Sequence, residues 1–355
     1  MAKDIIKLGD VATYINGYAF KPEDRGEEGL QIIRIQDLTG NSYDLGFYNG
    51  KYPKKIEIND GDVLISWSAS LGVYVWNGGK ALLNQHIFKV KFDKVDIDKS
   101  YFVYAVRYKL NDMGKKTHGA TMKHIVKRDF DATEIPYPPL KKQIEIAINL
   151  DKVLMVIKER KRELKLLDEL IKARFVEMFG DPIQNPKGWE VVTIGDIVTE
   201  VRYGTSKPAV EGGKYPYLRM NNLTADGHLD LNDLKYIDIP DDEIEKCVVR
   251  KGDVLFNRTN SIELVGKTAV FDLPEDMIIA GYIIRVRLTE KMLPEVLSQY
   301  MNLEALKGIL RGMAKGAVNQ ANINAQELQS IKVYIPEMEL QKQFVKMKEQ
   351  IYKSK

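Results

Sequence analysis

Two glycine-containing segments of the chain gather basic and amide side chains, the types that bind nucleic acid. They are residues 114–128 and 311–324. Lysine and arginine attract phosphates whatever the sequence, whereas Asn, Gln, Arg and His can pair with base edges. The glycines would let a ligand approach the backbone closely. The candidate DNA-contacting residues here are Lys115, Lys116, His118, Thr121, Lys123, His124, Lys315, Asn319, Gln320 and Asn322.

A second pair of candidate segments follows a four-residue sequence that occurs twice. Gly-Asp-Val-Leu stands at 61–64 and again at 252–255, and small polar residues follow each copy. Each copy predicts a turn that leads into a strand, with the polar residues near the end of that strand. The candidates are Ser66, Trp67, Ser68, Asn257, Arg258, Thr259 and Asn260. The structural alternative is that these Ser, Thr and Asn side chains only cap their own loops.

The sequence lacks the motifs of common catalysts. No phosphate-binding G-x-x-x-x-G-K-[ST] loop is present, and the four histidines have neither a hydrolase nor a zinc-protease context. The single cysteine, Cys247, excludes an intramolecular disulfide, and we expect it to be a half-buried small apolar residue. The run Asp241–Lys246 offers the acids and lysine of a magnesium nuclease, but we expect a solvated turn. We therefore predict no catalytic residue and no metal site.

The paired sequences belong to a longer internal repeat. Six segments recur in the same order: 7–21, 32–38, 61–70, 84–92, 119–125 and 135–146 correspond to 193–207, 217–223, 252–261, 280–288, 316–323 and 333–344. Each copy begins with short alternating runs bounded by Gly, Asn and Asp, which predict strands and turns. We expect helical pieces at 101–110 and 297–310 between them. The sequence therefore predicts a duplicated domain that mixes helices and strands, of the α+β class.

A long helix should follow the first copy. Its apolar residues alternate in steps of three and four, the heptad pattern of a coiled coil, over about 142–178. The expected helix-helix or partner interface is Leu150, Val153, Ile157, Leu164, Leu167, Ile171 and Met178. Arg160 and Arg174 occupy two seam positions, which suggests that a further surface packs there. The alternative is a surface helix packed on its own domain. Residues 179–190 should form a linker.

Composition leaves the choice of partner open. The net charge of +3 and the isoelectric point near 8.5 permit nucleic-acid binding without demanding it. No stretch approaches the roughly 20 apolar residues of a membrane span, and the N-terminus has no signal-peptide pattern. We therefore expect no membrane partner and a cytoplasmic protein.

The ordered motifs resemble one known family. Gly-Asp-Val near the start is followed by Ile-Arg-Ile-Gln-Asp-Leu, by Gly-Asp-Val-Leu with polar residues, and by a Gly-rich loop ending in His-Ile or Asn-Ile. Ile-Pro-x-Pro, a glutamine and a long helix complete the order. This order is similar to that of the specificity subunit of type I restriction–modification systems. The similarity covers essentially the whole chain and occurs twice, and residues 175–197 resemble the family's junction between the central helix and the second recognition domain.

The resemblance implies an architecture and a function. Two duplicated target recognition domains would each bind one half of a split double-stranded DNA site, mostly in the major groove. Long antiparallel coiled-coil helices would join the domains and dock DNA methyltransferase subunits, expected to number two. The domains would be residues 1–140 and 189–337, with the long helix at 141–179, a linker at 180–188 and the start of a second helix at 338–355. That second helix would be truncated, about 22 residues shorter than the first.

The resemblance also assigns the chemistry to partners. The methyltransferase subunits would bring S-adenosylmethionine, and restriction or motor subunits would bring ATP and Mg²⁺, while this chain would bind no cofactor and would not be an enzyme. Two alternatives from other classes stay open. One is a self-contained Mg²⁺-dependent nuclease with duplicated recognition domains, and the other is a tandem module that binds sugars or peptides.

Overall fold

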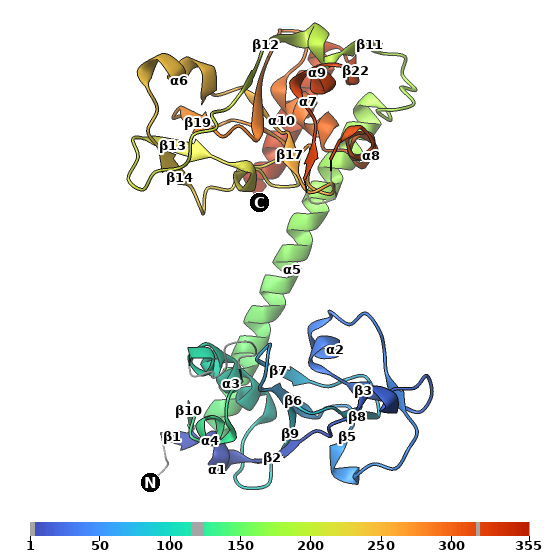
Figure 1. Ribbon diagram of the computed structural model, residues 1–355, viewed down its shortest axis with the longest axis vertical. Helices are drawn as coiled ribbons and strands as arrows, with labels where there is room; N and C mark the ends of the chain where they lie inside the picture. Colours follow the sequence, from blue (N-terminus) through green and yellow to red (C-terminus); the bar gives the residue numbers. More distant parts are fainter. Residues whose placement is uncertain (1–3, 116–123, 317–319, 355) are drawn as a thin grey trace. The chain divides into compact units, whose positions relative to one another are not determined.

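The computed structural model describes residues 4–115, 124–316 and 320–354, and the chain divides into two compact units (Figure 1). Unit 1 comprises Met1–Lys158 and unit 2 comprises Glu159–Lys355. The boundary falls within the long helix α5 (Leu140–Phe179), so the first half of this helix belongs to unit 1 and its second half to unit 2.

Unit 1 is built from short strands, as its alternating sequence predicts. The antiparallel order β2-β9-β6-β7 forms one sheet, and β4-β3-β8-β5 forms another in which β3 runs parallel to β8. A small sheet pairs β1 with β10. The strands are β1 (Ile5–Lys7), β2 (Thr13–Asn16), β3 (Leu30–Ile33), β4 (Phe47–Tyr48), β5 (Glu57–Ile58), β6 (Val63–Ser66), β7 (Gly72–Val75), β8 (Ala81–Leu83), β9 (Ile87–Lys91) and β10 (Glu134–Pro136). The helices are α1 (Leu8–Val11), α2 (Ile35–Thr39), α3 (Lys99–Lys115) and α4 (Lys127–Asp131), with 3₁₀ turns at Pro22–Asp24 and Lys54–Ile56.

Unit 2 repeats this topology. Its sheets follow the orders β12-β20-β16-β18, β14-β13-β19-β15 and β11-β22, again with one parallel pair, between β13 and β19. The strands are β11 (Glu190–Thr193), β12 (Val198–Tyr203), β13 (Tyr215–Leu218), β14 (Lys235–Ile237), β15 (Val248–Val249), β16 (Val254–Asn257), β17 (Thr259–Asn260), β18 (Thr268–Val270), β19 (Met277–Ile279), β20 (Ile283–Leu288), β21 (Ala321–Asn322) and β22 (Lys332–Ile335). The helices are α6 (Asp241–Cys247), α7 (Pro294–Met301), α8 (Glu304–Met313), α9 (Ala325–Gln329) and α10 (Met338–Ser354), with 3₁₀ turns at Ile194–Ile197 and Met220–Asn222. The same strand order in both units confirms the predicted duplication and the α+β class.

Individual hydrogen bonds repeat as well as strands. Gln143, at the start of α5, donates to the carbonyl of Pro138 over 2.8 Å and accepts from the backbone N–H of Asp98 over 3.0 Å. Gln341, in α10, donates to the carbonyl of Pro336 over 2.8 Å and accepts from the backbone N–H of Leu293 over 2.9 Å. Both glutamines are buried. Each therefore fixes the start of its helix to the body of its own unit through the same pair of bonds.

The two Gly-Asp-Val-Leu segments form the predicted turn and strand. Gly61 and Gly252 have φ angles of 84° and 93°, in the left-handed region that glycine enters without strain. The aspartate that follows accepts from a backbone N–H three residues earlier, Asp62 from Asn59 and Asp253 from Arg250. The strands β6 and β16 that follow are buried along their whole length.

Helices α5 and α10 pack antiparallel in unit 2. Phe344 lies between Phe175 and Phe179, with ring centroids 5.3 and 5.4 Å apart, whereas near the other end Arg160 donates to the carbonyl of Ser354 over 3.0 Å. The Arg160 cation thus meets the C-terminal end of α10, where a helix dipole favours positive charge. This contact accounts for an arginine at one seam position.

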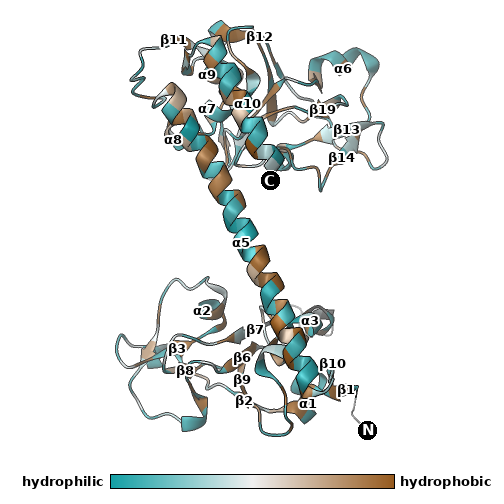
Figure 2. Cartoon of the chain, turned by 180° about the vertical axis from the view of Figure 1, so that it is seen from behind, coloured by the Kyte–Doolittle hydropathy of each residue, from teal (hydrophilic) through white to brown (hydrophobic). Residues whose placement is uncertain are grey.

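The predicted seam of α5 is covered over only part of its length. Ile171 is buried and Leu164, Leu167 and Met178 are partly buried, whereas Leu150, Val153 and Ile157 are exposed. Figure 2 shows apolar residues, in brown, along α5. Helix α10 is 17 residues long and α5 is 40. The structure therefore supplies a helical partner for the C-terminal part of the seam.

Several local predictions need correction. The expected single helix at 297–310 is two helices, because Asn302 leaves the helix and its side chain bonds both the N–H and the carbonyl of Thr268 in β18. The expected turn at Asp241–Lys246 is helix α6, which follows Pro240 and has acids in its first turn, where a helix dipole favours them. Cys247, expected to be half-buried, is 3% exposed.

Candidate nucleic-acid interface

Unit 2 brings its two candidate segments together at the end of β16. Strand β17, which follows the Gly-Asp-Val-Leu segment, pairs with β21 from the polar loop, so Thr259 lies opposite Asn322. The backbone N–H of Ile323 donates to the carbonyl of Arg258 over 2.9 Å, and the Asn322 amide donates to Thr259 Oγ1 over 3.1 Å. Segments that the sequence offered as separate candidates thus form one edge.

Unit 1 builds the same edge. The backbone N–H of Ile125 donates to the carbonyl of Trp67 over 3.0 Å, and Ser68 forms an antiparallel bridge with His124. Trp67 Nε1 also donates to Asn16 Oδ1 over 3.2 Å. The backbone contacts match those of unit 2, so the two edges are equivalent although their side chains differ.

Four of the candidates are buried parts of this framework. Ser66, Ser68, Asn257 and Thr259 are less than 8% exposed. Ser66 donates to the carbonyl of Ser70, and the Asn257 amide donates to the carbonyls of Thr259 and Tyr282. In this conformation their side chains do not reach the surface. For these positions the structure favours the alternative of a loop held by its own polar side chains.

The remaining candidates differ in how accessible they are. Arg258, Asn260, Asn322, Trp67 and His124 are half-buried at the edge, and Gln320 and Lys315 are exposed. Lys116, His118, Thr121, Lys123 and Asn319 lie outside the described residues, and Lys115 is described only as the last residue of α3.

Lys315 is tied to a carboxylate beside the edge. Its ammonium lies 2.6 Å from Glu327. The hydrogen bond from Lys315, followed by one from the backbone N–H of Asn324, lowers the pKa of Glu327. This carboxylate therefore stays charged at neutral pH and offsets the positive charge of Lys315.

The edge of unit 2 opens into a cavity that the sequence did not indicate. This basic pocket, of about 570 Å³, is lined by Thr205, Ser206, Lys207, Pro208, Ala209, Tyr217, Arg219, Met220, Asn221, Arg258, Ala280, Gly281 and Tyr282. Its lining includes three cationic residues and no carboxylate. Lys207 and Arg219 each pair with an acid outside the lining, Glu243 at 2.9 Å and Asp233 at 2.7 Å.

Arg258 differs from the other cations of the basic pocket. Among the described residues it has no carboxylate partner, and its guanidinium carbon lies 5.0 Å from the ring centroid of Tyr203. Its terminal nitrogens donate to the carbonyl of Gly281 over 3.3 Å and to Asn322 Oδ1 over 3.2 Å. Tyr203 was not among the sequence candidates. The paired segments 7–21 and 193–207 place Asn16 opposite Arg202, so no sequence signal pointed to Tyr203. In the structure a register shift after Val198 makes Tyr203 the equivalent of Asn16, because Gly17 and Gly204 donate in the same way to the carbonyls of Ile87 and Ile283.

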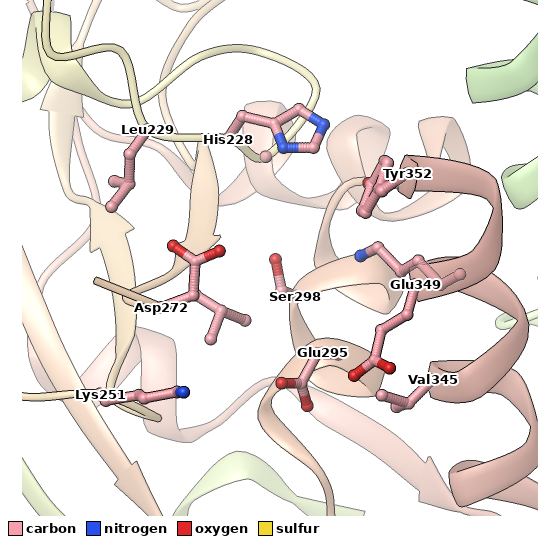
Figure 3. Close-up of a pocket in the computed structure, with 12 residues that line it drawn as sticks. His228, Leu229, Lys251, Asp272, Glu295, Ser298, Val345, Glu349 and Tyr352 are labelled. Atoms are coloured by element: carbon pink, nitrogen blue, oxygen red, sulfur yellow. The ribbon is translucent and has the colours of Figure 1, made fainter. Parts of the chain in front are cut away.

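A second cavity of unit 2, of about 320 Å³, has mixed charge (Figure 3). Figure 3 shows Ser298 and Glu295 of α7, Val345 and Glu349 of α10, and Lys251, Asp272 and His228 around it. Carboxylates and bases alternate in this lining, so it offers no uniform attraction to a polyanion. The basic pocket, whose lining carries only positive charge, is the better match to DNA.

One group of side chains next to this second cavity could hold a metal ion. Asp168, Asp226 and His228 each place a ligand atom within 4.8 Å of the others. The His228 ring also packs edge-on against Tyr352, with centroids 5.0 Å apart, and all three side chains take part in other interactions. This grouping was not expected from the sequence, because Asp168 lies about 60 residues before the other two. No metal-ligand spacing was therefore visible in the sequence.

The comparison with protein families decides the identity of the chain. The model of the type I restriction modification DNA specificity domain matches residues 3–166 and again residues 186–355. The chain belongs to this family. The double match agrees with the repeated topology, and the resemblance inferred from the sequence is confirmed: the chain is a type I specificity subunit.

Two curated relatives match this specificity subunit over almost its whole length, and a third matches less than half of it. It is 25% identical over 380 residues to the type I restriction enzyme EcoBI specificity subunit of Escherichia coli. The aligned region covers 98% of this chain and 78% of that relative. The EcoKI specificity subunit of Escherichia coli strain K12 is 25% identical over 384 residues, which covers 98% of this chain and 82% of that relative. A putative MjaX specificity subunit of Methanocaldococcus jannaschii is 32% identical over 166 residues, 46% of this chain and 39% of the relative.

Solved structures share the fold of the specificity subunit. The crystal structure of the type I restriction–modification S subunit from M. genitalium matches with a TM-score of 0.53 at 15% identity, covering 99% of this chain and 89% of that chain. A chain from a structure of type I R-M complex assembly matches with a TM-score of 0.57 at 19% identity, covering 99% and 90%. At these identities the likeness establishes the fold alone. None of the described helices is long and apolar enough to cross a membrane.

Proposed function

We propose that this specificity subunit recognises a bipartite double-stranded DNA site, with each unit reading one half through the edge at the end of β6 or β16. The observation that carries the proposal is the combination of a shared backbone and divergent side chains. Ile125 bonds the carbonyl of Trp67 just as Ile323 bonds the carbonyl of Arg258. Two readers of different sequences need a common support and different contacting groups, because base edges are distinguished by their hydrogen-bonding patterns.

The charge of the two edges supports the same function. In the sequence, the segment before His124 is rich in lysine, and in unit 2 Arg258 lines the basic pocket. Positive groups that neutralise phosphates supply affinity and release counterions, so we expect binding to weaken as salt is raised. The net charge of only +3 means that this attraction is local to these surfaces.

The long helices would provide the partner surface. Exposed apolar residues of α5 include Val153, Met155, Val156 and Ile157, which are 45–65% exposed. A row of exposed apolar side chains on one helix is typical of a surface that another protein covers. We propose that α5 and α10 dock the DNA methyltransferase subunits of the system, two in number, and that restriction or motor subunits join that complex.

The catalytic chemistry would belong to the partners. S-adenosylmethionine would be held by the methyltransferase subunits, and ATP and Mg²⁺ by the restriction subunits, while this chain supplies the choice of site. We place it in the cytoplasm with the DNA that it reads. A purified preparation of this chain, incubated with duplex DNA and Mg²⁺, should leave the DNA uncut. Cleavage by the chain alone would favour the alternative of a self-contained nuclease.

An exchange of unit 2 tests the modular reading. Residues 185–335 are replaced by the corresponding segment of another specificity subunit, and the exchanged chain is expressed with its own methyltransferase subunit. Methylome sequencing should show one changed half-site, while the other half stays as in the unexchanged chain. If both halves change, or if neither does, the assignment of one half-site to each unit is wrong.

A further inference from the structure

The edges of the two units carry different chemistry at equivalent backbone positions. The backbone N–H of Trp67 donates to the carbonyl of His86 over 3.1 Å, and that of Arg258 donates to the carbonyl of Tyr282 over 2.9 Å. Trp67 and Arg258 therefore occupy the same place in the fold. A planar aromatic side chain stands there in unit 1, and a cation with a planar donor group stands there in unit 2.

The residue that contacts each of these two side chains also differs between the units. Asn16 accepts a hydrogen bond from the Trp67 indole, and the equivalent residue of unit 2, Tyr203, lies against the Arg258 guanidinium. The Tyr203 hydroxyl accepts from the backbone N–H of Ala325 at the start of α9 over 2.8 Å. The ring of Tyr203 is therefore fixed, and it fixes the plane of the guanidinium in turn.

Arg258 is left with unused hydrogen-bonding capacity. Its Nε is buried and has no partner among the described residues. Its bonds to Gly281 and Asn322, at 3.3 and 3.2 Å, are at the long limit for N–H···O contacts. A guanidinium has five N–H groups, and two of them make these bonds, so the other three donors, the buried Nε and one on each terminal nitrogen, form no hydrogen bond with the described residues. Buried donors without acceptors are unfavourable, and they mark a place where an acceptor can bind.

The other arginine of the basic pocket belongs to the common framework. Arg219 Nη2 bonds Asp233 at 2.7 Å, and its equivalent in unit 1, Arg34, is bonded to Asp37 and Asp44. An arginine that makes carboxylate pairs in both units does not distinguish the two half-sites. Arg258 does, because its place in unit 1 is taken by Trp67.

We propose that Arg258 is a specificity-determining residue of unit 2 and that it selects a guanine in the half-site read by that unit. This inference rests on the proposed function. The ligand must present acceptors to a rigid planar fork, which both a guanine edge and a phosphate can do. The O6 and N7 atoms of guanine match an arginine fork in the major groove, and this pair is the commonest specific contact to a base. Tyr203 and Asn322 are positioning residues that set the plane of the fork.

Methylome sequencing with the complete system tests the assignment. The chain carrying Arg258→Ala is expressed with its own methyltransferase subunit, and methylated sites are compared with those of the unchanged chain. We expect one G·C position of the unit 2 half-site to relax, with discrimination there falling roughly 5- to 150-fold. The unit 1 half-site should not change. A motif that stays the same at every position would overturn the proposal.

Two further variants separate reading from folding. Arg258→Met keeps an unbranched apolar stem against Tyr203 but removes every donor, so it should relax the same position. Arg250→Ala is the matched control, because Arg250 is another unit 2 arginine, before the Gly252 turn, and it pairs with Glu245 and Asp276. Relaxation of the same position by Arg250→Ala would mean that the effect is structural, and would refute the role of Arg258.

The positioning role of Tyr203 has its own readout. Tyr203→Phe keeps the ring beneath the guanidinium and should retain the guanine preference, whereas Tyr203→Ala should relax the same position that Arg258→Ala relaxes. If Tyr203→Ala weakens every position equally, the tyrosine does not act through Arg258.

Duplex binding by the complex of specificity and methyltransferase subunits separates guanine from phosphate. The probe is a duplex that carries the site with 7-deazaguanine at the relaxed position, which removes the N7 acceptor and leaves the base pair intact. It should bind the unchanged complex less tightly and the Arg258→Ala complex no differently from normal DNA. The contrary outcome is that Arg258→Ala reduces the slope of the logarithm of the binding constant against the logarithm of salt concentration by about one, without relaxing any position. In that case Arg258 binds a phosphate and the proposal fails. Failure of the proposed function is distinct, because the unchanged chain would then yield no two-part motif.

Discussion

Gly204 lies where the end of β12 meets the turn between β19 and β20, and replacing it with alanine should both destabilise unit 2 and disturb its half-site. A Cβ built at this position would lie 2.2 Å from the carbonyl oxygen of Ile279 and 2.4 Å from that of Ala280. Both neighbours are backbone atoms, so no side-chain rotation relieves the contact. The next residue, Thr205, pairs with Ala280, and both line the basic pocket.

The size of the effect follows from this geometry. Contacts of 2.2 to 2.4 Å are about 1 Å shorter than ordinary van der Waals separations, so the two strands must move apart. Overpacking of this kind costs about 1–3 kcal/mol, and we expect the upper end because backbone must move. For a unit of this size, about 3 kcal/mol lowers the melting temperature by roughly 6–12 °C.

A matched substitution elsewhere in unit 2 should have the opposite sign. Gly308 lies in α8, and a Cβ built there has no neighbour within 4 Å. Gly308→Ala should stabilise unit 2 by up to about 1 kcal/mol, because alanine favours the helix over glycine. Calorimetry of the complete chain gives the melting shifts, and hydrogen exchange of the β20 amides assigns them to unit 2. Methylome sequencing then shows whether the unit 2 half-site alone is weakened.

The reasoning is refuted if Gly204→Ala leaves the melting temperature within 2 °C of the unchanged chain, since the close approach would then not exist. It is also refuted if Gly204→Ala weakens the unit 1 half-site as strongly as the unit 2 half-site. Gly17 offers an independent repeat in unit 1, where a Cβ would lie 1.9 Å from the carbonyl oxygen of Asn84. Gly17→Ala should reverse which half-site suffers.

Two further predictions concern the core of unit 2. Phe344→Ala should cost about 3–5 kcal/mol in calorimetry, because Phe344 is fully buried against Phe175. Leu166→Ala, at a residue 53% exposed on the unit 2 half of α5, should change stability by less than about 0.5 kcal/mol, and equal effects would contradict the packing of α10 on α5. Burial lowers the pKa of Lys307 to about 8 from its usual 10.5. Between these values the unfolded chain binds a proton that the folded chain does not, so stability should rise with pH by about 3 kcal/mol across this window relative to Lys307→Met. Parallel pH profiles of the two chains would show that folding does not lower the pKa of Lys307.

Local sequence patterns were sufficient for the framework of this protein. Continuous apolar runs after a Gly-Asp turn predicted β6 and β16, and those turns needed only a left-handed glycine and an acid that binds the preceding backbone. The heptad pattern likewise predicted α5 to within two residues at either end. These features depend on neighbours in the chain, so a single sequence carries them.

Predictions failed where a distant contact overrode the local pattern. The helix expected through 297–310 breaks because Asn302 bonds Thr268, 34 residues away, in preference to continuing the helix. Buried Ser66, Ser68 and Asn257 looked like surface groups, since Ser and Asn are usually exposed, and only the packing of the loops over them removes them from solvent.

The sequence by itself determined that one framework is written twice and that polar segments follow each of its Gly-Asp-Val-Leu strands. Only the tertiary structure decided which of those polar groups are buried and which remain accessible at the edge. Arg258 donates a hydrogen bond to Asn322, 64 residues further along the chain, and its guanidinium lies over the ring of Tyr203 at the end of β12. The physical reason is that strand register and turn geometry are set by adjacent residues, whereas the burial and pairing of a charged side chain depend on the segments that fold back over it.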